Sequence, residues 1–168
     1  MADVWLILGG ARSGKTTRGL TLVGKNPKPI YIATAEARDG EMQDRIVRHK
    51  AERGPEWTTV EAPLDLRGAL LTADGAGKAI LVDCLTLWLS NLMEAGRAPE
   101  DEVRALVAAL QGMSATVVFV SNEAGLGIVP DNSLARAFRD AQGRINQIVA
   151  TVANHVELIV AGLPLTIK

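Results

Sequence analysis

Short apolar, β-branched runs alternate along the chain with segments of helical periodicity, and this alternation predicts an α/β domain with a mostly parallel sheet. Strands are expected at Val4–Leu8, Pro29–Ala33, Ala79–Val82, Thr116–Val120 and Val156–Ala161, with a further short one at Trp57–Glu61. Helices are expected to begin at Lys15, at about Gly40, after Leu64, after Cys84, near Pro99 and after Asn132. The segment Glu94–Asp101 combines Gly, Pro and charge, and it is predicted to be the clearest internal loop. Neither a repeat nor a shift in composition marks a second domain, so residues 1–168 are predicted to form one domain.

Composition narrows the class of protein. The 168 residues are 48% hydrophobic, which is enough for a sizeable core. The net charge is -1 and aromatic residues make up 4%, so nothing suggests a nucleic-acid surface. The single cysteine, Cys84, excludes an intramolecular disulfide and fits a reducing compartment. The first apolar run stops at Leu8, and no segment approaches the roughly 20 apolar residues of a membrane span. We therefore expect a soluble, cytoplasmic protein.

The most informative short motif follows the first predicted strand. GGARSGKTT fits the pattern G-x-x-x-x-G-K-[ST], from Gly9 through Gly14, Lys15 and Thr16. Glycines let the backbone fold around an anion, and the N–H groups of the loop and of the helix N-terminus then point at phosphates. In this arrangement Lys15 reaches the β- and γ-phosphates and the Thr16 hydroxyl binds Mg²⁺. The motif predicts a nucleotide site but does not specify a reaction.

A carboxylate is expected near such a loop. AILVD places Asp83 at the carboxyl end of a buried strand, where open α/β sheets bind ligands. Asp83 either contributes to a Mg²⁺ or nucleotide site or caps the helix that follows it, and the phosphate-loop motif favours the first role. The N-K-x-D guanine signature of switch GTPases is absent from the sequence, which argues against a signalling switch.

A histidine lies among basic residues in EMQDRIVRHKAER. On a helix, Arg45, His49 and Arg53 form one stripe at spacings of four. One interpretation is a solvated basic helix. The other is a neutral imidazole that attacks a phosphate while arginines neutralise the developing charge. Nearby cations favour the neutral imidazole, but residue chemistry leaves both interpretations open.

Other polar residues near predicted strand ends also have two interpretations. Glu61 is either a surface carboxylate or a hydrogen-bonding partner for a ribose or base. Ser121, Asn122 and Glu123 follow a strand and either sense a nucleotide or substrate or form a cap or turn. Three arginines on the segment after them contact a phosphate, a neighbouring subunit or only solvent: Arg136, Arg139 and Arg144.

An ordered series of segments carries a resemblance to a known family. It comprises GGARSGKT, YIATAEARDGEMQDRIVRHKAER, WTTVEAP, LVDCLTLWLSNL, VSNEAGLGIVP, FRDAQGRINQ, VANHVELIVAG and PLTIK, and covers nearly the whole chain. Together the segments resemble the bifunctional adenosylcobinamide kinase/adenosylcobinamide-phosphate guanylyltransferase family of cobalamin biosynthesis. The histidine segment and VSNEAGLGIVP are much more specific than the phosphate loop. The resemblance implies a P-loop NTPase fold similar to RecA and a homotrimer.

The resemblance also implies two reactions. ATP or GTP phosphorylates the aminopropanol hydroxyl of adenosylcobinamide, and GMP is then transferred from GTP to that phosphate, with release of pyrophosphate. The position that matches the histidine carrying GMP is His49, and Lys15 with Mg²⁺ would stabilise the leaving pyrophosphate. The family's nucleotide contacts map onto Gly9, Gly10, Ala11, Arg12, Ser13, Gly14, Lys15, Thr16, Thr34, Ala35, Glu36, Lys50, Ala51, Glu52, Arg53, Glu61 and Asp83, with Thr16 and Asp83 as metal ligands. One departure is visible: the family commonly has proline directly after the arginine at Arg53, whereas here Gly54 precedes Pro55.

Three functional hypotheses follow. The first is the bifunctional enzyme, with a corrinoid substrate, ATP and GTP as nucleotides and Mg²⁺ as cofactor. The second is a P-loop kinase of another small hydroxyl compound, without guanylyl transfer. The third is a non-catalytic nucleotide-binding or RecA-like assembly module, whose DNA-binding form is disfavoured by the charge balance.

Overall fold

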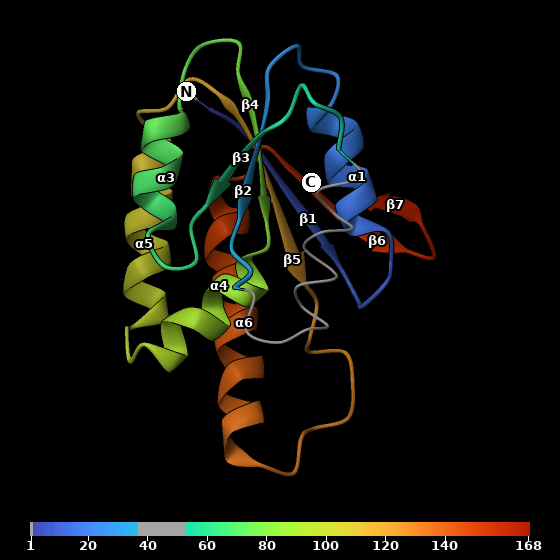
Figure 1. The fold of residues 1–168 in the computed structure, drawn as a ribbon. Helices are drawn as coiled ribbons and strands as arrows, with labels where there is room; N and C mark the ends of the chain where they lie inside the picture. The colour runs from blue at the N-terminus through green and yellow to red at the C-terminus, as the bar shows by residue number, and fades with distance from the viewer. Residues whose placement is uncertain (1, 37–52) are drawn as a thin grey trace.

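The computed structural model of the protein describes residues 2–36 and 53–168 (Figure 1). The helix expected from about Gly40 and the predicted site residues His49, Lys50, Ala51 and Glu52 lie outside the described residues. The strands are β1 (Asp3–Gly9), β2 (Pro29–Ala33), β3 (Thr58–Glu61), β4 (Ala79–Asp83), β5 (Thr116–Asn122), β6 (His155–Val160) and β7 (Leu163–Thr166). The helices are α1 (Lys15–Val23), α3 (Leu66–Ala73), α4 (Leu85–Glu94), α5 (Pro99–Leu110) and α6 (Ser133–Val152).

The strands form one seven-stranded sheet in the order β3-β2-β4-β5-β1-β6-β7. All neighbouring pairs are parallel except β6 and β7, which are antiparallel. The predicted α/β class with a mostly parallel sheet is therefore confirmed. Every predicted strand is present, and each predicted helix start within the described residues falls within two residues of the observed one.

The strand β7 was not expected from the sequence. This strand is exposed throughout and contains Pro164, and both properties are typical of an edge strand rather than of a buried run. A tight turn joins β7 to β6, with positive φ at Ala161 (51°) and Gly162 (80°).

The predicted loop Glu94–Asp101 is shorter than expected. Glu94 ends α4 and Pro99 already begins α5, so the connection consists of residues 95–98. Proline is favoured in the first turn of a helix because its missing N–H has no intrahelical partner there. Three carboxylates in the same turn, Glu100, Asp101 and Glu102, interact favourably with the helix dipole. Residues 95–98 form the predicted loop, whereas Pro99, Glu100 and Asp101 begin a helix.

The sheet separates two layers of different thickness (Figure 1). The larger core cluster joins one face of the sheet to α3, α4, α5 and α6, with the fully buried Trp88 and Phe119 among its largest side chains. The smaller cluster covers the opposite face, on which α1 packs, and includes Val23, Tyr31 and Leu81. The central strands β2, β4 and β5 are buried on both faces, and they therefore appear in the sequence as continuous apolar runs.

The topology brings several strand ends to one edge. Gly9 at the end of β1 is paired with Asn122 on β5, and Asp83 at the end of β4 is paired with Val120 on the same strand. Parallel strands present their carboxyl ends together, so the glycine loop after β1 and the carboxylate after β4 share the edge at which open α/β sheets bind ligands.

Candidate functional site

The loop between β1 and α1 has the geometry that the glycine motif requires. A Cβ on Gly9 would lie 2.4 Å from Ser13 Oγ and 2.9 Å from the carbonyl oxygen of Ile159, which leaves no room for a side chain. Gly14 is the N-cap of α1 and has φ of 98°, a left-handed conformation that glycine adopts without strain. Ser13 Oγ is buried and has no hydrogen-bond partner among the described residues. The loop therefore leads directly into a helix N-terminus and encloses an unsatisfied hydroxyl.

Lys15 lies in the first turn of α1 and folds back over the loop. Its Nζ donates a hydrogen bond to the carbonyl oxygen of Gly10 at 2.9 Å. Burial lowers the pKa of Lys15, and the nearby Cys84 and Asp83 oppose part of that shift. Asp83 is thus close enough to Lys15 to act on it electrostatically, as the two motifs predicted.

Asp83 does not cap the helix that follows it. The N-cap of α4 is Cys84, which makes no side-chain capping bond. Instead, Asp83 Oδ2 accepts a hydrogen bond of 3.0 Å from the hydroxyl of Tyr31 on β2. The carboxylate is therefore oriented at the loop edge by a side chain from the neighbouring strand.

Thr34 is fully buried directly after β2, and its hydroxyl is occupied by the protein itself. Thr34 Oγ1 donates to the carbonyl oxygen of Cys84 and accepts from the backbone N–H of Cys84, both at 2.8 Å. The carbonyl oxygen of Thr34 accepts from Asn91 Nδ2, also at 2.8 Å. These bonds fix the β4–α4 turn that carries Asp83. Ala35 and Glu36, the other two residues of this predicted contact set, follow directly and are half-buried.

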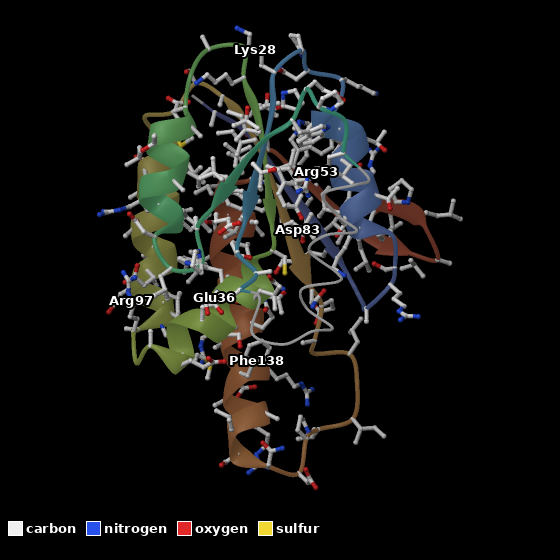
Figure 2. The ribbon with its side chains drawn as sticks, viewed as in Figure 1. Lys28, Glu36, Arg53, Asp83, Arg97 and Phe138 are labelled. Atoms are coloured by element: carbon white, nitrogen blue, oxygen red, sulfur yellow. The ribbon has the colours of Figure 1, made fainter. Side chains whose placement is uncertain are left out.

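Arg53 joins this group from the segment before β3 (Figure 2). Its guanidinium carbon lies 3.5 Å from the centre of the Tyr31 ring, in cation–π geometry. The Nε and Nη1 atoms of Arg53 are buried and find no hydrogen-bond partner within the described part of the chain. A buried guanidinium whose donors lack partners favours the binding of an anion at this place.

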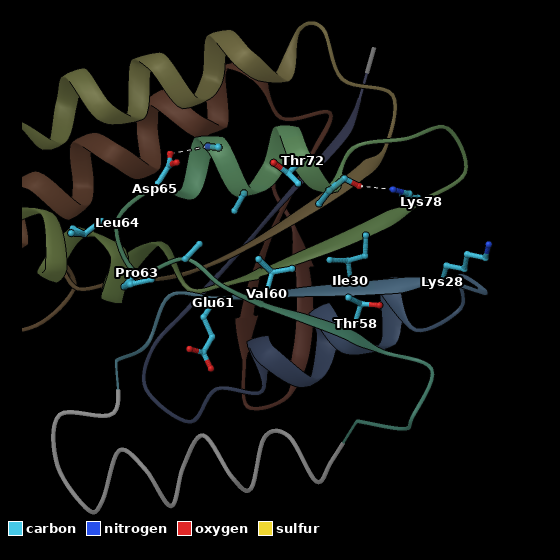
Figure 3. Close-up of a pocket in the computed structure, with 14 residues that line it drawn as sticks. Lys28, Ile30, Thr58, Val60, Glu61, Pro63, Leu64, Asp65, Thr72 and Lys78 are labelled. Carbon is cyan, nitrogen blue, oxygen red and sulfur yellow. Dashed lines mark hydrogen bonds between the residues drawn. The ribbon is translucent and has the colours of Figure 1, made fainter.

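Glu61 lies at the edge of the sheet and lines a groove of about 700 Å³ between β3, β2 and α3. Figure 3 shows its carboxylate on the side of β3 that faces away from α3, whereas Val60 and Ile30 line the apolar floor. The residues lining the groove do not include any of the phosphate loop. The structure therefore brings Lys15, Asp83, Tyr31 and Arg53 together and places Glu61 at a separate edge position.

The end of β5 carries a buried polar network that sequence reasoning did not identify. Ser121 Oγ donates to Asn146 Oδ1 at 2.7 Å, and Gln142 Nε2 donates to Ser121 Oγ and Asn146 Oδ1 at 2.9 and 3.0 Å. Asn146 Nδ2 donates to the carbonyl oxygen of Asn122, whose N–H donates to Thr86 Oγ1. The i, i+4 spacing of Gln142 and Asn146 on the same stripe as Ile145 was the available signal.

Several contacts link this network and the following loop to their surroundings. The N–H of Glu123 donates to the carbonyl oxygen of Gly9 at 3.0 Å, which ties the end of β5 to the phosphate loop. Arg136 donates to the carbonyl oxygens of Pro130 and Asp131, and Arg139 donates to that of Gly125. These two arginines therefore brace the β5–α6 loop, while Arg144 pairs with Glu100 of α5 at 2.6 Å.

Mg²⁺, which the phosphate-loop motif implies, fits the groups present. The Thr16 hydroxyl at the start of α1 and the Asp83 carboxylate are hard oxygen donors of the kind that Mg²⁺ prefers. Within residues 2–36 and 53–168 there is no cluster of three or more His, Cys, Asp or Glu side chains suited to holding a metal. Few protein ligands suit a Mg²⁺ ion that takes its other ligands from phosphates and water.

Comparison of the sequence with known proteins identifies a family. Residues 5–167 match the family described as cobinamide kinase / cobinamide phosphate guanyltransferase. The bifunctional adenosylcobalamin biosynthesis protein CobU of Salmonella typhimurium is 44% identical, with 97% of this chain and 98% of that protein covered. The bifunctional adenosylcobalamin biosynthesis protein CobP of Pseudomonas aeruginosa is 43% identical, with 97% and 96% covered.

Two further findings concern the fold. A solved structure from Pyrococcus horikoshii OT3 superimposes with a TM-score of 0.58 at 10% identity, covering 99% of this chain and 86% of that one, and so supports the fold alone. Among the described helices, none has both the length and the apolar character needed to cross a bilayer. The near-complete coverage and high identity of the relatives, together with the glycine loop opposite Asp83, lead to one conclusion: the chain belongs to the cobinamide kinase / cobinamide phosphate guanyltransferase family.

Proposed function

We propose that the protein phosphorylates adenosylcobinamide with ATP or GTP and then transfers GMP from GTP to the resulting phosphate, forming adenosylcobinamide-GDP and pyrophosphate. The observation that carries the proposal is the glycine loop with Lys15, set against Asp83, in a chain that is 44% identical over nearly its full length to a bifunctional CobU protein. In this proposal residues 1–168 form one catalytic domain that acts in the cytoplasm.

The loop supports binding of a triphosphate. Its backbone leads into the N-terminus of α1, whose N–H groups and dipole favour an anion. The lowered pKa of Lys15 reflects loss of hydration through burial, and a bound phosphate would supply the partner that water no longer provides. The unsatisfied Ser13 hydroxyl is a further donor inside the loop. These groups would hold the β- and γ-phosphates for phosphoryl transfer to the corrinoid hydroxyl.

Thr16 and Asp83 are the proposed Mg²⁺ ligands. When bound, the ion would neutralise charge on the phosphate oxygens. Asp83 would serve this purpose as an oriented carboxylate, because Tyr31 and the Thr34-supported turn hold its position. The buried hydroxyl of Thr34 supports a positioning role, while Ala35 and Glu36 remain proposed nucleotide contacts.

His49 is the proposed nucleophile of the second reaction. Its imidazole nitrogen attacks the α-phosphorus of GTP, the bond to the pyrophosphate oxygen breaks, and a guanylyl-histidine forms. A phosphate oxygen of adenosylcobinamide phosphate then attacks the same phosphorus and releases the histidine. Arg53, with two buried and unsatisfied nitrogens near Asp83, supports charge neutralisation in this region. Lys50, Ala51, Glu52 and Glu61 complete the proposed nucleotide contacts.

We propose that the protein is a homo-oligomer, and a trimer by family resemblance. Exposed apolar side chains support association. They cluster in the β5–α6 loop and the start of α6, at Leu126, Ile128, Val129 and Leu134, and in the C-terminal strands, at Leu163 and Leu165.

Covalent capture of GMP tests the proposed function. The protein is incubated with GTP and Mg²⁺, and intact mass spectrometry is expected to show one covalent GMP that is labile in acid and stable in alkali. His49→Ala should abolish the adduct. The chain has one other histidine, His155, which begins β6 and stacks on Trp5, so His155→Ala is a matched control that should retain the adduct.

Two outcomes would revise the assignment. If the wild-type protein binds GTP but never forms the adduct, the guanylyltransferase assignment fails. If phosphorylation of a small hydroxyl substrate persists in His49→Ala and the wild type transfers no GMP, the simpler P-loop kinase is the better assignment.

A further inference from the structure

Tyr31 lies between two groups of the proposed site and was not among the predicted site residues. It is only 4% exposed, and its register on β2 places it beside Leu81 of β4. Its ring lies under the Arg53 guanidinium, and its hydroxyl reaches Asp83 two positions further along β4. One side chain therefore contacts both the carboxylate at the metal position and the arginine that follows the histidine segment.

The hydroxyl of Tyr31 is a dependable donor. A phenol is protonated near neutral pH, and that of Tyr31 donates its hydrogen to Asp83 Oδ2 at 3.0 Å from a side chain that is only 4% exposed. A carboxylate held by a fixed donor loses rotational freedom before it meets a metal ion.

The ring of Tyr31 has a separate contact. The Arg53 guanidinium carbon lies 3.5 Å from the ring centre, and Trp57 packs edge-on against the same ring with centroids 6.4 Å apart. The face of the ring offers a favourable electrostatic contact to a guanidinium that has unmet donors. The hydroxyl and the ring can thus be removed independently by substitution.

We propose that Tyr31 is a positioning residue of the nucleotide site, whose hydroxyl orients Asp83 toward the metal–nucleotide complex and whose ring supports Arg53. The inference rests on the proposed function, because it takes Asp83 as a metal ligand. It goes further in assigning to a residue that was not among the predicted nucleotide contacts the task of connecting Asp83 to Arg53.

Metal affinity is the first readout. Tyr31→Phe removes the hydroxyl and keeps the ring, and it should weaken Mn²⁺ binding to the complex with the α,β-methylene analogue of GTP by about tenfold, since loss of such an outer contact typically weakens affinity by 10- to 100-fold. Electron paramagnetic resonance of free Mn²⁺ measures the affinity. Binding of the analogue in EDTA should stay within twofold of wild type. In the Asp83→Asn background, Tyr31→Phe should add no further loss.

The ring is tested with a second variant. Tyr31→Leu removes both contacts, so at saturating Mg²⁺ it should slow formation of the GMP adduct more than Tyr31→Phe does. If Tyr31→Phe weakens metal-free nucleotide binding as much as Mn²⁺ binding, the residue is merely structural and the inference fails. Equal adduct rates in Tyr31→Phe and Tyr31→Leu would refute the role of the ring.

A spectroscopic measurement needs no substitution. Tyr31 is the only tyrosine of the chain, so biosynthetic labelling with 3-fluorotyrosine gives a single ¹⁹F resonance from this position. Adding Mg²⁺ to the protein loaded with the α,β-methylene analogue should shift that resonance, and Asp83→Asn should reduce the shift. A resonance that does not respond to bound Mg²⁺ overturns the inference.

The outcomes separate this inference from the proposed function. If Asp83→Asn binds Mn²⁺ as well as wild type does, the metal assignment fails and the inference fails with it. If Asp83→Asn weakens binding while Tyr31→Phe leaves it unchanged, only the inference fails. The GMP adduct of wild type is a separate measurement that neither result alters.

Discussion

The ion pair between Arg18 and Glu157 is expected to anchor the helix that carries the phosphate-binding lysine. Arg18 lies one turn after Gly14 on α1, and its Nε and Nη2 donate to the two carboxylate oxygens of Glu157, both at 2.8 Å. Glu157 is on β6, paired with Ile7 of β1, and its side chain is 8% exposed against 30% for that of Arg18. The pair therefore fastens the first turns of α1 to β6.

Removing one partner should be more harmful than removing both. Arg18→Met leaves a buried carboxylate without its two charge-assisted hydrogen bonds, and breaking a buried pair in this way costs about 3–5 kcal/mol. Water can reach the arginine side of the pair, so we expect the lower end, about 3 kcal/mol. The double variant Arg18→Met/Glu157→Met buries no charge. Its free energy of unfolding should exceed that of Arg18→Met by at least about 1 kcal/mol, because apolar replacement of a buried ion pair is often neutral or stabilising.

Urea unfolding of the wild type, both single variants and the double variant at pH 7 measures these free energies. For a chain of this length, 3 kcal/mol corresponds to a fall in Tm of about 6–12 °C. The reasoning would be refuted by a double variant that is no more stable than Arg18→Met, including one whose loss equals the sum of the two single losses.

Two other features give sharp predictions. Burial raises the pKa of the Cys84 thiol to about 11, and the nearby Asp83 carboxylate adds to the effect. At pH 8 the native protein should therefore react with Ellman's reagent about a hundredfold more slowly than its urea-unfolded form. Equal rates would contradict this prediction. Urea unfolding measures the next pair of variants. Asn146→Leu leaves its partners in the buried network unsatisfied and should lower the free energy of unfolding by about 2–4 kcal/mol. Gln142→Met also removes an acceptor that lacks a partner within the described residues, so its loss should be under about 1 kcal/mol. The reverse order of stability would show that the network is not held through Asn146.

Much of the fold could be predicted because its signals are local. A buried parallel strand reads as a continuous apolar run, and the glycine loop needs only the chain between β1 and α1 to specify its shape. Asp83 was placed correctly at a strand end because the run AILVD stops there. In contrast, the exposed β7 carries no burial signal, and the EAGRAPED segment reads as a loop although Pro99 begins a helix.

The contacts that organise the site depend on strand order, which the sequence does not display. Tyr31 reaches Asp83 only because β2 lies directly beside β4, although 52 positions separate the two residues in the chain. In the same way, Thr34 bonds to Cys84 across 50 positions. From the sequence alone, the tyrosine in PIYIA is indistinguishable from an apolar strand residue, and the threonine that follows this run is typical of a turn. Neither periodicity nor motif spacing reveals which strand will be the neighbour.

The end of β5 shows how two helices on one face of the sheet act on the phosphate loop. Ser121 faces α6 and is held by Gln142 and Asn146, while the backbone of Asn122 bonds to Thr86 on α4. The next N–H, that of Glu123, donates to the carbonyl oxygen of Gly9, the first residue of the phosphate loop. The buried amides therefore fix the backbone at the end of β5, and the N–H of Glu123 in turn holds the start of the glycine loop. The packing of α6 thus constrains the geometry of phosphate binding at the edge of the sheet.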